Sequence, residues 1–455
     1  MSVTRVLVAN RGEIAVRVIK ACRSLGIETV AAVSEADRDS LPARLADRAV
    51  CIGPARSFES YLQAGALVAA AAGTGCDALH PGYGFLAERA ELAELCAEHH
   101  ITFIGPTAEN IRRMGDKLEA RRIAAAAGVP TVPGSERAKN AVEAEALAAK
   151  IGYPILLKAA AGGGGRGIKL VRDAAELHGT FATAAAEARA AFGDDTLYLE
   201  RYIANARHIE VQVLGDAFGH VIHLGERDCS LQRRHQKVIE EAPAYAVSPG
   251  VRSRICKAAA TLARSIGYRN AGTVEFIFDA DTDDFFFLEM NTRIQVEHPV
   301  TEMVTGVDLV AQQLMIARGQ PLALKQSDVR VRGHAVECRI NAESPRHGFR
   351  PCPGRITKWE PPQGAGIRLD THCYGGYVVP PFYDSLLAKL IVHGSDRGDA
   401  TARARRALAS FEVAGIDTGI PFLQAVMDDP DYLAGRVNTR WLEEKLEAYA
   451  AAAAA

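Results

Sequence analysis

Residues 1–114 alternate short apolar segments with segments of helical periodicity, and this alternation restricts the possible folds more than any other feature of the chain. Strands are predicted at R-V-L-V-A-N, T-V-A-A-V-S, A-V-C-I-G, D-A-L-H-P-G and I-T-F-I-G. Helical spacing connects Ile14, Val18, Cys22 and Leu25, with Gly26 as the stop. Further helices are predicted from about Glu59 and over Glu88–His99. A repeated strand–helix–strand order is typical of a doubly wound parallel sheet.

The chain has 455 residues, which is too many for one hydrophobic core, so we expect a multidomain protein of the α/β and α+β classes. Changes in pattern place the parallel-sheet domain at 1–114, a central domain at 115–329, a mixed α+β domain at 330–447 and an alanine-rich tail at 448–455. Within the central domain, residues from about 131 to 203 lie between Pro/Gly-rich connections and are expected to form a mobile lid. The tail has no apolar face beyond Leu446 and is expected to fray.

The composition limits the partners and the cellular compartment. Apolar residues make up 48% of the chain, and the net charge of −2 gives no reason to expect a nucleic acid or a membrane as partner. The N-terminus lacks a signal-peptide pattern, and the longest weakly apolar run, Ala64–Ala72, is too short to cross a bilayer. Nine cysteines without a C-x-x-C pair favour reduced, mostly buried thiols. We therefore expect a cytoplasmic protein.

The segments G-T-V-E-F-I-F-D and F-F-F-L-E-M-N, joined by A-D-T-D-D, predict a β-hairpin centred on Thr282. Glu275 and Glu289 lie equally far from that centre, so they are expected directly opposite each other. The same register gives two apolar pairs on the core side, Phe276 with Leu288 and Phe278 with Phe286. Two carboxylates about 5 Å apart repel each other, so a cation is expected between them. Mg²⁺ or Mn²⁺ fits, with Asn291 as a third oxygen ligand, while a solvated strand face is the alternative.

The glycine-rich segment Gly162–Gly167 contains G-x-G-x-x-G, but the predicted strand I-K-L-V follows it where a dinucleotide-binding fold needs a helix. Ile168 also occupies the position at which a Walker A loop needs a lysine. Consecutive glycines still allow backbone N–H groups to surround a phosphate, and Lys158 and Arg166 add positive charge. The segment is therefore interpreted as a phosphate-binding loop between two strands, with a mobile surface loop as the alternative.

Two further polar clusters follow the glycine loop. Five basic residues lie close together, namely Arg227, Arg233, Arg234, His235 and Lys237. Every second residue is polar in the predicted extended stretch that carries Glu289, Asn291, Arg293, Gln295 and Glu297. Solvated faces have similar patterns, but beside a glycine loop and a carboxylate pair these clusters favour binding of phosphate or another small oxyanion.

The order of these motifs resembles that of the ATP-grasp ligases, and specifically of biotin carboxylase. The resemblance extends from Val6 to Lys445 and rests on V-A-N-R-G-E-I-A-V-R, H-P-G-Y-G-F-L-A-E, M-G-D-K, G-G-G-G-R-G, E-R-D-C-S-L-Q-R-R-H-Q-K, E-M-N-T-R-I-Q-V-E-H-P-V-T-E and R-G-H-A-V-E-C-R-I-N-A-E. The sequence is similar to the free-standing biotin carboxylase subunits of bacterial acetyl-CoA carboxylase. This implies a Rossmann-like N-terminal domain, a central ATP-grasp domain and a C-terminal biotin carboxylase domain.

The resemblance also implies roles for individual residues. The implied ATP contacts are Lys117, Lys158, Gly164, Gly165, Glu200, Arg201, Tyr202, Ile203, His208, Gln232, His235, Glu275 and Glu289. The implied metal ligands are Glu275, Glu289 and Asn291, and the implied bicarbonate contacts are Lys237, Arg293, Gln295, Val296 and Glu297. Arg339 is implied to hold the ureido oxygen of biotin, with Tyr83 near the same end of the site.

The implied activity is the ATP-dependent carboxylation of biotin through carboxyphosphate, assisted by Mg²⁺ or Mn²⁺ as two ions. The implied catalytic residues are Lys237, Arg293, Glu297 and Arg339, with Glu297 as the general base. No methionine lies beside a lysine, so biotin is expected on a separate carrier protein. The other implied partners are carboxyltransferase subunits and a second copy of the chain, as in the first half-reaction of malonyl-CoA and fatty acid synthesis. Alternatives are a pyruvate- or propionyl-CoA-type carboxylase and a catalytically silent ATP-binding module.

Overall fold

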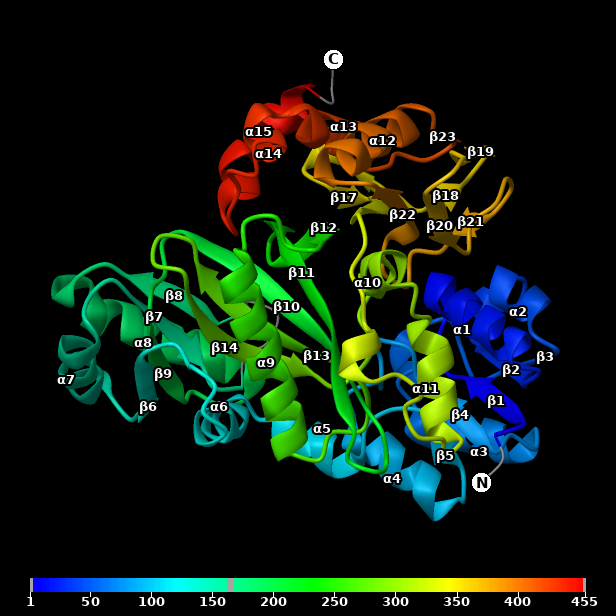
Figure 1. Cartoon of the computed structure of the whole chain (residues 1–455), viewed down its shortest axis with the longest axis horizontal. Coiled ribbons are helices and arrows are strands. Elements are labelled where there is room, and N and C mark those ends of the chain that lie inside the picture. Colours follow the sequence, from blue (N-terminus) through cyan, green and yellow to red (C-terminus); the bar gives the residue numbers. More distant parts are fainter. Residues whose placement is uncertain (1–2, 162–166, 453–455) are drawn as a thin grey trace.

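The computed structural model describes residues 3–161 and 167–452. The N-terminal region contains a five-stranded sheet in the order β3-β2-β1-β4-β5 (Figure 1), and every neighbouring pair is parallel. Its strands are β1 (Arg5–Val8), β2 (Glu28–Val33), β3 (Arg48–Cys51), β4 (Ala78–His80) and β5 (Thr102–Phe103). The associated helices are α1 (Gly12–Ser24), α2 (Leu41–Leu45), α3 (Ala64–Gly73), α4 (Ala90–Glu98) and α5 (Ala108–Gly115). This confirms the predicted parallel sheet.

The helix predicted from Glu59 begins later, at Ala64. Tyr61 accounts for this difference, because its side chain is fully buried and anchored before the helix begins. The Tyr61 ring stacks on Phe85 with 5.0 Å between ring centroids, and the Tyr61 hydroxyl donates a 2.8 Å hydrogen bond to Asp37. Only a single 3₁₀ turn precedes this anchor, at Ser57–Glu59.

A second, four-stranded sheet in the order β6-β9-β7-β8 lies at the left of Figure 1 and falls within the expected lid range. Its elements are β6 (Gly134–Ala138), α7 (Ala141–Ile151), β7 (Ile155–Ala159), β8 (Ile168–Val171), α8 (Ala174–Phe192) and β9 (Leu197–Arg201). Strands β7 and β8 pair antiparallel, so a strand does follow the glycine loop, as predicted. Gly164, Gly165 and Arg166 lie outside the described residues, and closure of the lid on ATP stays a prediction.

The largest sheet has eight antiparallel strands in the order β14-β13-β10-β11-β12-β15-β22-β20. These are β10 (Ala206–Gly215), β11 (Val221–Arg233), β12 (Gln236–Ala242), β13 (Asn270–Asp279), β14 (Asp284–Asn291), β15 (His334–Asn341), β20 (Ile367–Thr371) and β22 (Leu386–Gly394). The sheet crosses the boundary predicted near residue 330, because β12 pairs directly with β15. The central and C-terminal regions are therefore joined by backbone hydrogen bonds.

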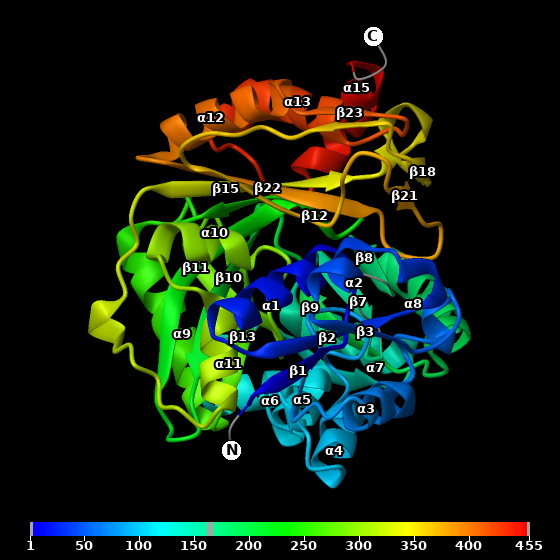
Figure 2. The same ribbon diagram turned by 90° about the vertical axis from the view of Figure 1, so that its right-hand side faces the viewer.

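The remaining helices pack around this sheet, as Figures 1 and 2 show. They are α6 (Lys117–Ala126), α9 (Pro249–Ser265), α10 (His298–Thr305), α11 (Leu309–Ala317), α12 (Arg397–Ala409), α13 (Ile420–Asp428), α14 (Pro430–Leu433) and α15 (Trp441–Ala452). Short strands complete the C-terminal region, namely β16 (Glu343–Ser344), β17 (Arg350–Pro351), β18 (Gly354–Arg355), β19 (Lys358–Glu360), β21 (Val378–Val379) and β23 (Glu412–Ala414). Helix α15 continues past Leu446, where fraying was expected, because the buried Tyr449 donates a 2.6 Å hydrogen bond to Asp429.

The β13–β14 hairpin pairs Glu275 directly with Glu289, as predicted. The predicted apolar pairs are wrong, because Phe276 pairs with Phe287 and Phe278 pairs with Phe285. The strands are joined by a shorter turn than the sequence indicated, and a β-bulge at Leu288 restores the pairing of the two glutamates.

The nine cysteines are all free thiols, and all but Cys51 and Cys352 are buried, which agrees with the expected packing role. Within the described parts of the chain, no helix has both the length and the apolar character needed to cross a membrane.

Candidate active site

A cavity of about 960 Å³ lies where the parallel sheet, the four-stranded sheet and the eight-stranded sheet meet. It brings together most of the residues that the sequence predicted for the site. Among its lining residues are Tyr83, Lys117, Lys158, Glu200, Arg201, Tyr202, Ile203, His208, Gln232, His235, Lys237, Glu275, Glu289, Asn291, Arg293, Gln295, Val296 and Arg339. Glu297 does not line the wall, because its side chain is fully buried behind Lys237 and Arg339.

The basic cluster is only partly at the cavity. His235 and Lys237 line it, whereas Arg227, Arg233 and Arg234 do not, so the prediction that the whole cluster binds an oxyanion is wrong. Arg227 is fully buried and forms an ion pair with the buried Glu210, and the other two arginines contact acidic side chains instead of facing the cavity. Arg233 pairs with Glu343 at 2.8 Å, and the backbone N–H of Arg234 donates to Glu443 at 2.8 Å.

The stretch that follows β14 is not the single extended strand that its alternation predicted. The strand ends at Asn291, and residues 292–297 form an irregular turn into helix α10. The fully buried Ile294 anchors this turn in an apolar cluster shared with the N-terminal region. The ring of His298 then contacts the carbonyl oxygen of Gln295 at 2.7 Å and closes the start of α10. The turn aims Arg293, Gln295 and Glu297 at one region, although no strand carries them.

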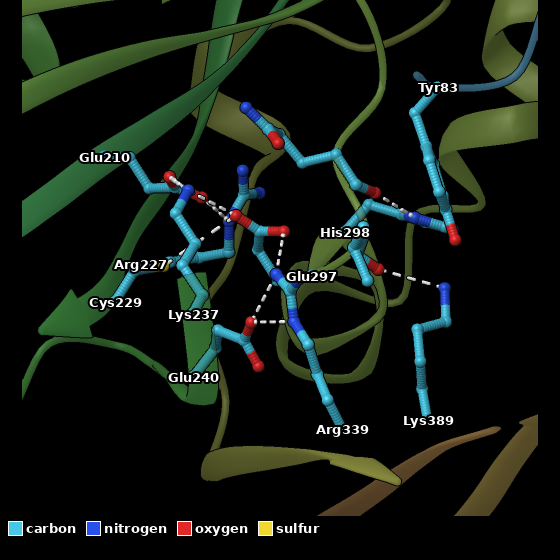
Figure 3. A network of polar contacts seen from close by, with 12 residues as sticks. Tyr83, Glu210, Arg227, Cys229, Lys237, Glu240, Glu297, His298, Arg339 and Lys389 are labelled. Atoms are coloured by element: carbon cyan, nitrogen blue, oxygen red, sulfur yellow. Dashed lines mark hydrogen bonds and ion pairs between the residues drawn. The ribbon is translucent and has the colours of Figure 1, made fainter. Parts of the chain in front are cut away.

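Glu297 is held between two cations (Figure 3). Lys237 Nζ donates to Glu297 Oε1 at 2.6 Å, and Arg339 donates to Glu297 Oε2 at 2.9 Å. Lys237 reaches the carboxylate from β12, and Arg339 reaches it from β15. On β15 the buried Val336, Cys338 and Ile340 alternate with Glu337 and Arg339, and this alternation determines where Arg339 points. The two cations fix the carboxylate in place beside the cavity wall that Lys237 and Arg339 line.

Glu210 and Arg227 complete this centre, although the sequence did not predict a role for Glu210. Glu210 accepts from Lys237 at 2.5 Å and from Arg227 at 2.6 Å, and both Glu210 and Arg227 are fully buried. The alternation in R-H-I-E-V-Q-V does predict that Glu210 shares a face with His208, but it indicates no role for Glu210. The sequence has no signal for its pairing with Arg227.

The buried charges shift one another's pKa values. Burial disfavours the charge on Lys237, but Glu210, Glu275 and Glu297 outweigh burial and raise its pKa well above the usual value. Burial likewise disfavours the charge on Glu275, yet Lys237 and His208 lower the pKa of Glu275 to about 2. Burial opposes a charged His208, but Glu275 raises the pKa of His208 to about 9. These shifts keep Lys237 and His208 cationic and Glu275 anionic at neutral pH, so the centre consists of paired opposite charges.

Replacing Arg227 with methionine is expected to destabilise the fold by about 3–5 kcal/mol, because a buried ion pair loses one partner. Arg227 also donates to Gln212 at 2.9 Å, Thr301 at 3.0 Å and Thr273 at 3.1 Å, and these groups would lose a donor. The shift of the unfolding midpoint in urea measures the effect. Arg403→Met is the matched control, because the ion pair of Arg403 with Asp399 lies on the surface of α12 and its loss should leave the midpoint unchanged.

One end of the cavity, around Lys117 and Lys158, combines cations with an apolar slot. Lys158 pairs with Glu200 at 2.5 Å, and Lys117 lies 3.4 Å from Glu289. Asp116 caps helix α6 by accepting from two backbone N–H groups, so M-G-D-K starts the helix at Lys117. The sequence did not predict the apolar lining residues, which include Leu156, Ile168, Leu170, Ile277 and Leu288. The bulge at Leu288 brings this residue to the cavity together with Glu289.

The opposite end of the cavity is ordered by the N-terminal region. Gly82 has a φ of +64°, and a Cβ there would lie 2.9 Å from the side chain of Asn10. That close approach allows Asn10 to donate to the carbonyl oxygens of Pro81 at 2.7 Å and Tyr83 at 2.8 Å. The Tyr83 hydroxyl in turn donates to Glu13. The motifs N-R-G-E and H-P-G-Y-G thus fix one another and aim Tyr83 into the cavity.

Lys389 is a second residue that sequence reasoning missed. It is fully buried, pairs with Glu13 at 3.0 Å and donates to the carbonyl oxygen of Val296 at 2.9 Å. A single lysine in the otherwise apolar strand L-L-A-K-L-I-V was the available signal, because an unpaired charge is not stable in such a strand. Figure 3 shows Lys389 on the side of Glu297 next to Tyr83.

The curated biotin carboxylase of Nostoc sp. is 53% identical over 445 residues, which cover 98% of this chain and 99% of the relative. The chain belongs to the biotin carboxylase family. The family descriptions agree along the chain, with "Biotin carboxylase, N-terminal domain" at residues 2–111 and "Biotin carboxylase C-terminal domain" at 337–444. Between them, residues 116–325 match "Carbamoyl-phosphate synthase L chain, ATP binding domain".

Other biotin carboxylases are similar over their whole length. Biotin carboxylase 1 of Bacillus subtilis is 52% identical, over 97% of this chain and 98% of the relative. The crystal structure of the Campylobacter jejuni biotin carboxylase in its β,γ-ATP complex superposes with a TM-score of 0.94, at 47% identity and with 97% of this chain and 99% of that one covered. The biotin carboxylase domain dimer of the Hydrogenobacter thermophilus 2-oxoglutarate carboxylase, solved with MgADP, ADP and bicarbonate, has a TM-score of 0.93 at 50% identity and 98% coverage of each chain.

The carboxylate and amide groups of the β13–β14 hairpin fit a magnesium ion like the one that accompanies ADP in the Hydrogenobacter thermophilus structure. Glu275 and Glu289 face each other across β13 and β14, and Asn291 donates to Glu275 at 2.7 Å. Both carboxylates are next to lysines, with Lys237 at 3.1 Å from Glu275 and Lys117 at 3.4 Å from Glu289. Paired carboxylates with an amide oxygen are hard ligands of the kind that Mg²⁺ and Mn²⁺ prefer.

Glu275→Gln and Glu289→Gln are each expected to raise the Mg²⁺ concentration needed for half-maximal ATP turnover by about 10- to 100-fold, because each removes one anionic ligand. Titration of Mg²⁺ at saturating ATP measures the change. Glu187→Gln is a suitable control, since Glu187 pairs with Lys169 at the surface of the four-stranded sheet. An unchanged Mg²⁺ requirement in both hairpin variants would exclude the hairpin as the metal site.

Proposed function

We propose that the chain carboxylates biotin on a separate carrier protein, using ATP and bicarbonate, in the first half-reaction of acetyl-CoA carboxylase. The observation that carries this proposal is the buried Glu297 held between Lys237 and Arg339 at the edge of the cavity. A fixed acid–base group between two cations suits a reaction that combines anions. The end-to-end similarity to single-chain biotin carboxylases supports the assignment.

The first step activates bicarbonate, which is a poor electrophile. Lys237 and Arg293 line the cavity, and their charges would bind the anion next to Glu297. Glu297 then removes the bicarbonate proton while a bicarbonate oxygen attacks the γ-phosphorus of ATP, which gives carboxyphosphate and ADP. A metal ion held by Glu275, Glu289 and Asn291 would neutralise charge on the phosphates.

The second step transfers CO₂ to biotin. Carboxyphosphate breaks down to CO₂ and phosphate, and the ureido nitrogen of biotin transfers its proton to the released phosphate before it attacks CO₂. The anion that forms carries charge on the ureido oxygen, and Arg339 offers a permanent positive charge at the cavity wall. A preorganised cation at a developing anion lowers the barrier of such a step.

Two assays of the purified chain test this proposal. Release of ADP should depend on bicarbonate, and free biotin should cause fixation of labelled bicarbonate in an acid-labile product. A catalytically silent ATP-binding module would bind ATP but show neither activity. The outcome with biotin therefore decides between an enzyme and a binding protein.

The carrier is expected to be a different polypeptide, because none of the methionines at positions 1, 114, 290, 303, 315 and 427 lies beside a lysine, as an A/V-M-K-M biotinylation motif would require. The 455-residue chain, expressed in biotin-fed cells and probed with streptavidin, should carry no covalent biotin. A biotinylated carrier protein from the same cells is the positive control. A labelled band at the mass of this chain would refute the prediction.

The final acceptor has a second candidate, because the biotin carboxylase subunit of pyruvate carboxylase is 50% identical over 98% of this chain and 99% of that one, with a TM-score of 0.87. We propose acetyl-CoA first and an oxo-acid second. Assays of this chain with its carrier and with the carboxyltransferase that co-purifies should yield malonyl-CoA in the first case. Carboxylated pyruvate or 2-oxoglutarate would favour the second.

We also propose that the chain forms a homodimer, supported by the dimer of the Hydrogenobacter thermophilus domain. Light scattering at micromolar concentration should give twice the mass of 48.7 kDa. A monomeric mass over the whole concentration range would refute this.

A further inference from the structure

Two carboxyl groups behind Arg339 have no role in the steps above. Glu240 on β12 and Glu337 on β15 are directly opposite in the antiparallel ladder, and both side chains are fully buried. Cross-strand acids normally repel, so a buried pair of this kind needs a reason. Figure 3 shows Glu240 beside the guanidinium of Arg339.

The two acids differ in what they contact. Glu240 Oε1 accepts from Arg339 Nε at 2.6 Å and is also 2.6 Å from a terminal nitrogen of the same guanidinium. Glu337 has no hydrogen-bond partner on either carboxyl oxygen among the described residues. Burial raises the pKa of Glu337 well above its usual value, and the nearby Glu240 adds to this shift, whereas Lys389 opposes it. Burial raises the pKa of Glu240 to about 7, although Arg339, its ion-pair partner, opposes this shift. Glu337 has no such partner among the described residues.

Arg339 has two acidic partners among the described residues, Glu240 and Glu297. The proposed base, Glu297, becomes neutral when it takes up the bicarbonate proton. A neutral carboxyl accepts hydrogen bonds more weakly than a carboxylate, so the hydrogen bond from Arg339 to Glu297 weakens at that moment. This is also the moment before the guanidinium is needed at the ureido oxygen of biotin.

We propose that Glu240 is the positioning residue of Arg339. It keeps the guanidinium aimed at the biotin end of the cavity after protonation of Glu297 has released one N–H group of the terminal nitrogen, which Glu240 still holds, for the ureido oxygen. The inference rests on the proposed function, because it assumes that Glu297 is the base and that biotin binds at Arg339. This role of Glu240 would connect the two steps, because removal of the bicarbonate proton frees the Arg339 N–H group that biotin then uses.

The chain provides a matched pair of variants, Glu240→Gln and Glu337→Gln, which alter equally buried acids on facing strands. Steady-state carboxylation of free biotin and bicarbonate-dependent ADP release without biotin are measured for each. Glu240→Gln should lower kcat/KM for biotin by roughly 10- to 100-fold, mainly through a higher KM, because one charge-assisted hydrogen bond is lost. Its ADP release without biotin should stay near that of wild type. Glu337→Gln should leave both activities unchanged.

Other outcomes overturn the proposal. Equal losses of both activities in Glu240→Gln would indicate a structural role, and a Glu240→Gln variant as active as Glu337→Gln would show that Arg339 needs no second anchor. If Glu240→Gln does not fold, Glu240→Asp replaces it, and its kcat/KM for biotin should fall less while ADP release persists. A wild-type chain that carboxylates no biotin would refute the proposed function instead.

Discussion

Glu297→Gln is expected to abolish bicarbonate-dependent ATP hydrolysis and biotin carboxylation together, with kcat falling by roughly 10²- to 10⁴-fold. The substitution keeps the volume of the side chain but removes its capacity to accept a proton. Among the described residues, Glu297 is the one acid that pairs with both Lys237 and Arg339. Without removal of the bicarbonate proton carboxyphosphate cannot form, and every later step stops.

A coupled assay of ADP release at saturating ATP and bicarbonate measures this loss, and labelled bicarbonate fixation measures the second activity. Binding of ATP without bicarbonate is the control, because Glu297 does not line the cavity. Near-normal ADP release by this variant would show that a different group takes the proton.

Arg339→Ala is expected to separate the two activities that Glu297→Gln removes together. Biotin carboxylation should fall by about 10²- to 10³-fold, because one preorganised charge at a developing anion is lost. Slow bicarbonate-dependent ADP release without biotin should largely survive, since that step forms no ureido anion. The ratio of the two rates is the decisive measurement.

The alanine variant leaves Glu240 and Glu297 without the guanidinium that each contacts, so its folding must be checked by its unfolding midpoint. Arg339→Lys is the companion variant, because it retains the charge but not the planar fork. Both variants should lose biotin carboxylation more than ADP release. Losses in equal proportion would contradict the assignment of Arg339 to biotin and of Glu297 to bicarbonate.

Local patterns predicted a large part of the architecture. The parallel N-terminal sheet followed from the alternation of buried strands and amphipathic helices, whose periods differ because side chains project differently from each element. The pairing of Glu275 with Glu289 followed from the alternation of side chains and a short turn. The strand after the glycine loop was also predicted, since I-K-L-V has no helical period.

Expectations failed where a distant contact outweighed the local pattern. The alternation after Asn291 predicted a strand, but the buried Ile294 and the start of α10 turn the chain. The apolar pairs of the hairpin were wrong because a bulge at Leu288 compensates the short turn. The basic cluster was assigned to an oxyanion, yet Arg227 is fully buried against Glu210, and no local pattern carries that information.

The sequence by itself determined the elements whose burial follows from their own period and the hairpin that pairs two glutamates. Through its motifs it also determined the family and many of the polar residues of the cavity wall. The tertiary structure alone decided which buried charges meet. Arg339 and Glu240 are 99 residues apart in the chain, and Lys389 and Val296 are 93 residues apart. Such pairs form because strand order and helix packing bring them together where a charge without a partner would be too unfavourable to bury. Periodicity records which face of an element is buried, but not what it is buried against.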